Sequence, residues 1–107
     1  MSVIQMNEYQ FNEAVFQNDA PVLVEFWAPW CVYCRRIAPA LNKVAKQYAD
    51  NLTVAQINID DEPRLADQEQ IEVIPTLILY KNGYAVDSIV APESKAKIDE
   101  FINAALG

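Results

Sequence analysis

Apolar residues follow two periodicities along the chain, one typical of strands and one typical of helices. The segment 22–27 is apolar on both faces except for Glu25, which predicts a central parallel strand covered by helices on each side. The segment 31–48 repeats apolar residues at helical spacing, and Pro39 inside it predicts a kink. The same two patterns predict further strands at about 3–6, 52–59, 73–80 and 84–90, and further helices at about 7–17, 60–70 and 94–106.

Cap and turn residues mark the ends of these elements. Asn7 can cap the first helix, and the segment 60–63 predicts a helix start with acids in the first turn and a proline near its beginning. Asn82-Gly83 is typical of a two-residue hairpin. The resulting order β-α-β-α-β-α-β-β-α predicts an α/β fold with a mixed sheet and helices on both faces. Without a repeat or a linker, we expect one domain over residues 1–107.

Composition and charge exclude several classes of function. With 107 residues, 52% of them hydrophobic, the chain can bury a core without disulfides or metal. A net charge of −7 and the lack of a Lys/Arg cluster argue against a nucleic-acid partner. The N-terminus has neither a basic segment nor a long apolar segment of a signal peptide, and no run is long enough to cross a membrane. We therefore expect a cytoplasmic protein without membrane contact, and a monomer.

Both cysteines lie in Cys31-Val32-Tyr33-Cys34, at the start of a predicted helix. Their spacing places the two sulfurs on one face of a first helical turn and allows a disulfide. A thiol there meets unpaired backbone N–H groups and the positive end of the helix dipole, which favour the thiolate. Such cysteines can have pKa values lowered from about 8.5 to roughly 3.5–7.5. In the cytosol, a cysteine pair is more often catalytic, redox-sensing or metal-binding than structural.

Three other interpretations of the cysteine pair stay open. A structural disulfide across four residues would contribute only about 2 kcal/mol in the loop-entropy model. A structural zinc site would need a second chain, because this chain has no histidine and no further cysteine. Two inert core cysteines are disfavoured by the neighbouring Trp27, Pro29, Trp30 and Pro39, which indicate a rigid, partly exposed turn.

Charged residues near the cysteines add further candidates. Alternation along its strand places Glu25 on the same face as Leu23 and Trp27, where burial would raise its pKa. A buried acid shortly before a thiol pair suggests a proton acceptor. The segment 26–49 contains no acid but four basic residues. They form a solvated helix face, or else Arg35 or Arg36 favours a nearby thiolate or an acidic partner.

Four short motifs, in order and spacing, resemble the thioredoxin family along essentially the whole chain: Trp27-Ala28-Pro29-Trp30-Cys31-x-x-Cys34, Ile37-Ala38-Pro39, Asn58-Ile59-Asp60 and Ile74-Pro75-Thr76. A lone Cys-x-x-Cys would be weak evidence, whereas its combination with Ile-Pro-Thr and the Asn-Gly hairpin is strong. The resemblance implies a thioredoxin fold, with a central five-stranded mixed β-sheet flanked by four α-helices. It also implies dithiol–disulfide exchange through a redox-active disulfide, with no cofactor and no metal.

The resemblance also assigns roles to matching positions. Cys31 would be the exposed attacking thiolate and Cys34 the buried resolving thiol, with Glu25 as the third catalytic residue. Pro75 would be a cis-proline opposite the disulfide, and substrate would bind at Trp30, Ile74, Pro75 and Ala91. The implied partners are protein disulfide substrates and a thioredoxin reductase.

At several positions the chain departs from the family pattern. Val32-Tyr33 replaces Gly-Pro between the cysteines, so Tyr33 adds a hydroxyl beside the sulfurs and a backbone N–H for the thiolate. That extra donor predicts a weaker reductant than a Gly-Pro thioredoxin. Glu25 replaces the family's buried aspartate, Gln56 the lysine near it, and Ala91 the glycine that borders the substrate groove.

The sequence therefore predicts a protein-disulfide reductase. A second hypothesis is a binding or chaperone module that uses an apolar groove around Trp30, Ile74 and Pro75, with redox activity secondary. A third is a metal-bridged dimer through Cys31 and Cys34 of two chains.

Overall fold

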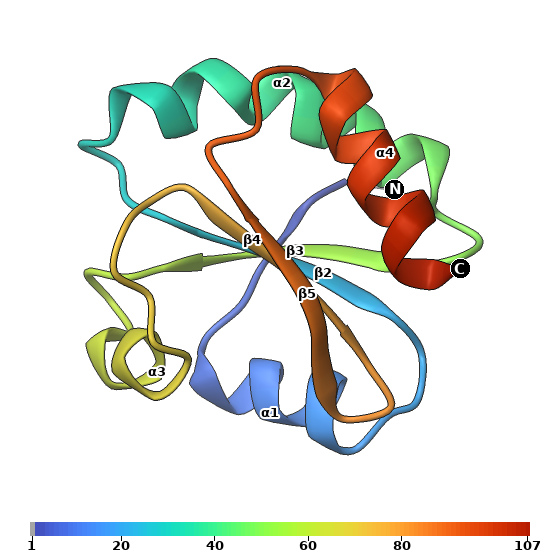
Figure 1. Ribbon diagram of the computed structural model, residues 1–107. Coiled ribbons are helices and arrows are strands. Elements are labelled where there is room, and N and C mark those ends of the chain that lie inside the picture. The colour runs from blue at the N-terminus through green and yellow to red at the C-terminus, as the bar shows by residue number, and fades with distance from the viewer. Residues whose placement is uncertain (1) are drawn as a thin grey trace.

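Strands and helices follow one another in the predicted order in the computed structural model, which describes residues 2–107 (Figure 1). The strands are β1 Ile4–Gln5, β2 Val22–Trp27, β3 Thr53–Asn58, β4 Thr76–Lys81 and β5 Tyr84–Val90. The helices are α1 Glu8–Phe16, α2 Val32–Gln47, α3 Pro63–Gln68 and α4 Lys95–Leu106. Within residues 2–107, no helix combines the length and apolarity needed to cross a membrane.

The strands form one mixed sheet in the order β1-β3-β2-β4-β5. Strands β1 and β2 run parallel to β3, β4 runs antiparallel to β2, and β5 runs antiparallel to β4. Helices α2 and α4 cover one face of the sheet, and α1 and α3 cover the other (Figure 1). The predicted five-stranded mixed sheet with four flanking helices is confirmed.

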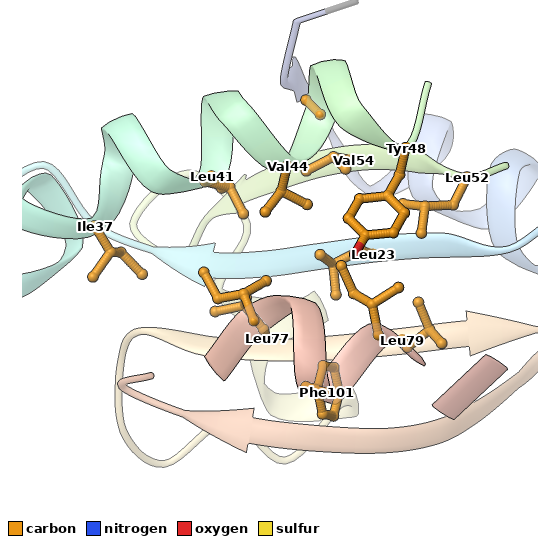
Figure 2. Packing of buried hydrophobic residues seen from close by; sticks show 13 residues of the cluster. Leu23, Ile37, Leu41, Val44, Tyr48, Leu52, Val54, Leu77, Leu79 and Phe101 are labelled. Atoms are coloured by element: carbon orange, nitrogen blue, oxygen red, sulfur yellow. The ribbon is translucent and has the colours of Figure 1, made fainter. Parts of the chain in front are cut away.

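Successive residues of β2 supply two separate cores. Leu23 packs with α2 and α4 in the cluster shown in Figure 2, whereas Val24 and Phe26 pack with α1 and α3. All three side chains are fully buried, and burying one such side chain contributes about 1.5–3 kcal/mol. Strand β2 is therefore apolar on both faces because helices cover both faces of the sheet, as predicted. This leaves Glu25 as the only charged residue of β2, the strand at the centre of the sheet.

Helix α2 begins directly after Cys31 and spans 16 residues. Its inward face carries Ile37, Leu41 and Val44, all of which are buried against the sheet (Figure 2). Pro39 lies inside the helix with an exposed side chain, and the kink predicted there stays a prediction. The buried stripe fixes the helix on the sheet, and so fixes the position of its N-terminal turn.

Two predicted boundaries are wrong, both because a local turn precedes the element. Helix α3 begins only at Pro63, and the acids expected in its first turn lie before it. There, Asn58 Oδ1 accepts from the backbone N–H of Asp60 at 2.9 Å, and the Asn58 carbonyl accepts from Glu62 at 3.0 Å. Strand β4 begins at Thr76 rather than at residue 73, because the Thr76 hydroxyl donates to the Val73 carbonyl at 2.6 Å and closes a turn.

The hairpin between β4 and β5 forms at the predicted Asn82-Gly83. Both residues have positive φ, 55° and 83°, as a type I′ turn requires. Strand β5 then runs over the predicted residues and ends before Ala91, which also has a positive φ of 45°. The chain thereby returns toward the end of the sheet that carries the cysteines.

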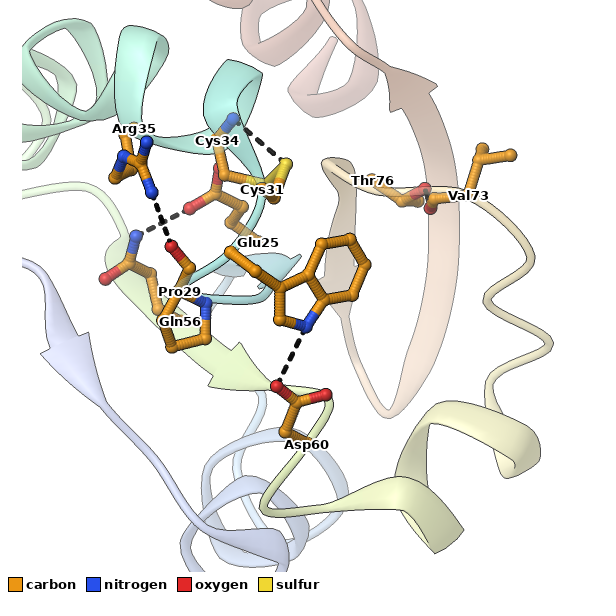
Figure 3. The surroundings of a disulfide bond; sticks show 10 residues. Glu25, Pro29, Cys31, Cys34, Arg35, Gln56, Asp60, Val73 and Thr76 are labelled. Carbon is orange, nitrogen blue, oxygen red and sulfur yellow. Dashed lines mark hydrogen bonds between the residues drawn. A yellow bond between two sulfur atoms is a disulfide. The ribbon is translucent and has the colours of Figure 1, made fainter.

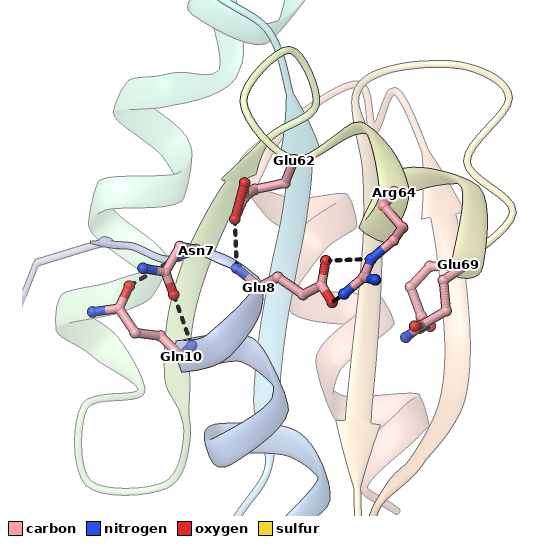
Figure 4. Close-up of polar contacts among 7 residues, drawn as sticks. Asn7, Glu8, Gln10, Glu62, Arg64 and Glu69 are labelled. Atoms are coloured by element: carbon pink, nitrogen blue, oxygen red, sulfur yellow. Dashed lines mark hydrogen bonds and ion pairs between the residues drawn. The ribbon is translucent and has the colours of Figure 1, made fainter.

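The starts of α1 and α3 are fastened to each other (Figure 4). Asn7 caps α1, as predicted, and Gln10 completes a capping box with it. The backbone N–H of Glu8 donates to Glu62 Oε1 at 2.6 Å, and Arg64 pairs with the Glu8 carboxylate. An exposed ion pair contributes only about 0–1 kcal/mol, so the contact mainly fixes the β3–α3 connection in place.

Candidate functional site

Cys31 and Cys34 form a disulfide at the N-terminus of α2 (Figure 3). Cys31 is the N-cap residue, and its Sγ accepts a hydrogen bond from the backbone N–H of Cys34 at 3.1 Å. The predicted position of the pair on the first helical turn is confirmed. A sulfur at this position lies where backbone N–H groups and the helix dipole stabilise negative charge.

The two sulfurs are unequally accessible. Cys31 is 8% exposed and Cys34 is 2% exposed, and both pack in a small cluster with Ala28 and Ile74. The expectation that Cys31 is exposed is therefore wrong for the disulfide form, because the neighbouring apolar side chains cover most of it. Cys31 is nevertheless the more accessible of the pair.

Trp30 lies on the surface beside the disulfide, 63% exposed. Its indole Nε1 donates to Asp60 Oδ2 at 2.9 Å (Figure 3). Trp30 follows β2 and Asp60 follows β3, and these parallel neighbours end at the same edge of the sheet. Our prediction did not include Asp60 as a site residue, although the topology and the Asn58-Ile59-Asp60 motif together contained the signal.

One of the predicted substrate-binding residues, Ile74, contacts the cysteine cluster, and a hydrogen bond joins its neighbour Pro75 to Ala91. The Ile74–Pro75 peptide bond is cis, as the resemblance implied. Ile74 packs against the cysteine cluster, and the Pro75 carbonyl accepts from the backbone N–H of Ala91 at 2.9 Å. Ala91 also lines a surface cavity of about 210 Å³ together with Pro92. The chain segments before β4 and after β5 are therefore tied together next to the disulfide.

Tyr33 lies differently from what we expected. Its hydroxyl donates to the Pro92 carbonyl at 2.9 Å instead of standing free beside the sulfurs, and the Arg36 guanidinium lies 5.9 Å from its ring centroid. The backbone donor to Cys31 Sγ is the N–H of Cys34, not that of Tyr33. This hydrogen bond belongs to the disulfide form, whereas the predicted weakening of the reductant concerns donors to the Cys31 thiolate in the reduced protein, so it stays a prediction.

Glu25 is fully buried, as predicted. Gln56 Nε2 donates to Glu25 Oε1 at 2.6 Å, whereas Glu25 Oε2 has no hydrogen-bond partner among residues 2–107 (Figure 3). Burial raises the pKa of Glu25 from 4.5 to about 7, and the hydrogen bond from Gln56 acts in the opposite direction. A carboxyl group with a pKa near neutrality can accept and return a proton at physiological pH.

Arg35 supports the loop that precedes the cysteines. Its Nη1 donates to the Pro29 carbonyl at 2.8 Å (Figure 3). The Arg36 guanidinium lies over the Tyr33 ring. The other two basic residues of α2, Lys43 and Lys46, are exposed. All four basic residues of α2 are therefore exposed, as the solvated-face interpretation predicts, and both arginines also have contacts within the site.

Metal ligands do not gather in the described part of the chain. Among residues 2–107, no group of three or more His, Cys, Asp or Glu side chains is arranged to hold a metal ion. The two cysteines are joined to each other. Cysteines joined in a disulfide offer no thiolate to a metal, and it is this bond, not the absence of a cluster within one chain, that counts against the metal-bridged dimer.

The comparisons with known proteins agree with this geometry. The family model named Thioredoxin matches residues 2–104. The chain belongs to the thioredoxin family. A relative named thioredoxin, from Porphyra purpurea, is 40% identical over 103 residues, which is 96% of both chains. Thioredoxin 1 of Nostoc sp. is 39% identical over 98 residues, which is 92% of both chains.

A longer relative is the chloroplastic M-type thioredoxin of Pisum sativum. It is 40% identical over 97 residues, which is 91% of this chain and 56% of that protein. Family membership and the Cys31–Cys34 pair together identify the chain as a thiol–disulfide oxidoreductase that works through a redox-active disulfide. The alternative of a binding or chaperone module is not favoured. In general, thioredoxins act on protein disulfides and exchange electrons with reductases.

Proposed function

We propose that this member of the thioredoxin family reduces disulfides of other proteins and is itself re-reduced by a thioredoxin reductase, with Cys31 attacking and Cys34 resolving. The observation that carries this assignment is the hydrogen bond from the Cys34 N–H to Cys31 Sγ at the helix N-terminus. It gives Cys31, the more accessible sulfur, a donor that favours the thiolate. Cys34 faces the interior and has no comparable access to substrate.

The proposed reaction exchanges sulfur partners in two steps. The Cys31 thiolate attacks one sulfur of a substrate disulfide, which forms a mixed disulfide and releases the other substrate sulfur as a thiolate. Cys34 then loses its proton to Glu25 through a bridging water and attacks Cys31 Sγ. This step forms the Cys31–Cys34 disulfide and releases the second substrate sulfur. Two electrons pass to the substrate, which leaves as a dithiol.

Glu25 suits the role of proton acceptor for Cys34. One of its oxygens is held by Gln56, and the other has no partner within residues 2–107 and is available for a proton. Its raised pKa keeps a sizeable fraction in each protonation state near neutral pH. Supporting this role further, Glu25 lies two residues before Trp27, which packs against the cysteine cluster.

Substrate is proposed to bind over the disulfide between Trp30 on one side and Ile74, Pro75 and Ala91 on the other. Trp30 is held by Asp60, and Ala91 by the Pro75 carbonyl, so both borders are preorganised. The methyl group of Ala91 narrows the substrate groove at a position where the family carries a glycine. We therefore expect substrates whose backbone approaches this strand end less closely.

Insulin reduction by dithiothreitol, followed by turbidity, tests the function. The wild-type protein should accelerate precipitation, and both Cys31→Ser and Cys34→Ser should abolish that acceleration. Cys34→Ser should also accumulate a covalent adduct with the substrate, whereas Cys31→Ser should form none. If Cys31→Ser instead accumulated an adduct on Cys34, the two roles would be reversed.

We further propose that the chain acts as a single-domain cytoplasmic monomer that binds neither nucleic acid nor a membrane. Its net charge of −7 supports the absence of nucleic-acid binding. Sedimentation of the oxidised and reduced protein should give one species near 12.1 kDa. A species of twice that mass would contradict the monomer.

A further inference from the structure

Three polar side chains form a row across three neighbouring strands. Gln5 of β1 is paired in register with Gln56 of β3, which is paired in register with Glu25 of β2. Residues opposite each other on adjacent strands point to the same face of a sheet. The row therefore runs from exposed Gln5, through partly buried Gln56, to fully buried Glu25.

Hydrogen bonds join the three side chains in one direction. Gln5 Nε2 donates to Gln56 Oε1, and Gln56 Nε2 donates to Glu25 Oε1 at 2.6 Å. A glutamine amide has a donor end and an acceptor end, so a partner that occupies its oxygen determines which way the NH₂ group points. In the opposite orientation, the Gln56 oxygen would face Glu25 and could bond only to its protonated form.

We propose that Gln5 is a positioning residue, which holds the Gln56 amide with its donor toward Glu25 and so favours the carboxylate form that accepts the proton of Cys34. This inference rests on the proposed role of Glu25 as that acceptor. Gln5 touches neither cysteine in this account and acts only through Gln56. Gln5 thereby provides part of the stabilisation that a cation beside the Glu25 carboxylate would provide.

Other charged groups around Glu25 do not account for its protonation state. Strands β1 and β3 contain no titratable residue. On β4, Tyr80 lies in the core on the opposite face and Lys81 is exposed. Helix α2 presents the Cys34 thiol in the reduced protein, and its basic residues, all exposed, are Arg35, Arg36, Lys43 and Lys46. The charged residues of α4 pair with one another, as Lys95 with Asp99 and Lys97 with Glu100.

Titration of Glu25 in Gln5→Leu tests the proposal. The side-chain carboxyl carbon of Glu25 is followed by NMR in uniformly carbon-13-labelled reduced protein, and its signal is assigned with Glu25→Gln. Leucine has a similar volume but offers no donor to Gln56. We expect the ratio of carboxylate to acid at pH 7 to fall by about threefold, less than the full loss of a hydrogen bond to a charged group would cause.

Two further variants separate positioning from general disturbance of the protein. Gln17→Leu makes the same change at an exposed glutamine after α1 and should leave the Glu25 titration unchanged. In a Gln56→Leu background, Gln5→Leu should have no additional effect, because the residue through which it acts is gone. An unchanged ratio in Gln5→Leu, or an equal change with and without Gln56, would overturn the proposal.

Turnover of the variants keeps this inference distinct from the proposed function. If Glu25 accepts the proton, the pH midpoint of insulin reduction should rise in Gln5→Leu together with the NMR titration. If Glu25→Gln left turnover unchanged, the proposed catalytic role of Glu25 would fail. A shifted titration in Gln5→Leu would then still establish Gln5 as the residue that orients Gln56.

Discussion

Replacing Glu25 by glutamine should stabilise the folded protein in a way that depends on pH. Glutamine keeps the size of the side chain and can still accept the hydrogen bond from Gln56, but it carries no charge. The ionised carboxyl group is disfavoured inside the protein because burial removes its water. The variant no longer carries this cost at any pH.

The size of the effect follows from the pKa of Glu25. One pKa unit corresponds to about 1.4 kcal/mol, so the rise from 4.5 to about 7 corresponds to about 3 kcal/mol. Because the folded state holds this proton more tightly than the unfolded state, the wild-type protein loses stability as pH rises from about 4.5 to about 7. Below that range the carboxyl group is neutral in both states, and above it the cost is constant.

Urea denaturation of the oxidised protein, repeated between pH 4 and pH 8, measures this effect. The free energy of unfolding of Glu25→Gln minus that of the wild type should increase across the range by about 3 kcal/mol and then level off. Glu72→Gln makes the same chemical change at an exposed position and should give a flat difference. A flat or falling difference for Glu25→Gln would mean that Glu25 is solvated and that its assigned chemistry is wrong.

Two further substitutions test the borders of the site. Ala91 has a φ of 45°, a conformation that costs a residue with a side chain roughly 1 kcal/mol. Ala91→Gly should therefore raise the free energy of unfolding in urea by about that amount, and a decrease in that free energy would contradict the strain argument. Tyr33→Phe removes the hydroxyl that donates to the Pro92 carbonyl and should lower that free energy by about 1 kcal/mol. Because that hydroxyl is engaged away from the sulfurs, the alkylation rate of reduced Cys31 should stay the same, and a changed rate would place the hydroxyl beside the thiolate.

The fold was predictable from the sequence because its signals are local. The apolar run of β2, the stripe on α2 and the Asn82-Gly83 turn each specify an element within a few residues of chain. Glu25 stood out for the same reason, as the one acid in an otherwise apolar strand. Boundaries were predicted less well where side chains close turns, as Asn58 does before α3 and Thr76 before β4.

Contacts between distant segments could not be predicted where the family resemblance does not imply them. The bond from Tyr33 to Pro92 spans 59 residues, and the bond from Gln5 to Gln56 spans 51. Both depend on strand register and on how loops pack, which single-residue patterns do not encode. The exposure of Cys31 was overestimated for a related reason, since Ile74 covers it from a segment about forty residues away.

The pH dependence of alkylation in the fully reduced protein tests the central claim, that Cys31 is the attacking thiolate, most directly. With iodoacetamide in slight excess and the products located by peptide mass spectrometry, Cys31 should react much faster than Cys34 at pH 7. The helix N-terminus lowers the pKa of Cys31 from the ordinary thiol value of about 8.5. The rate of its alkylation should therefore reach a plateau at a pH well below that value. Equal rates for the two cysteines, or a faster reaction at Cys34, would contradict the account.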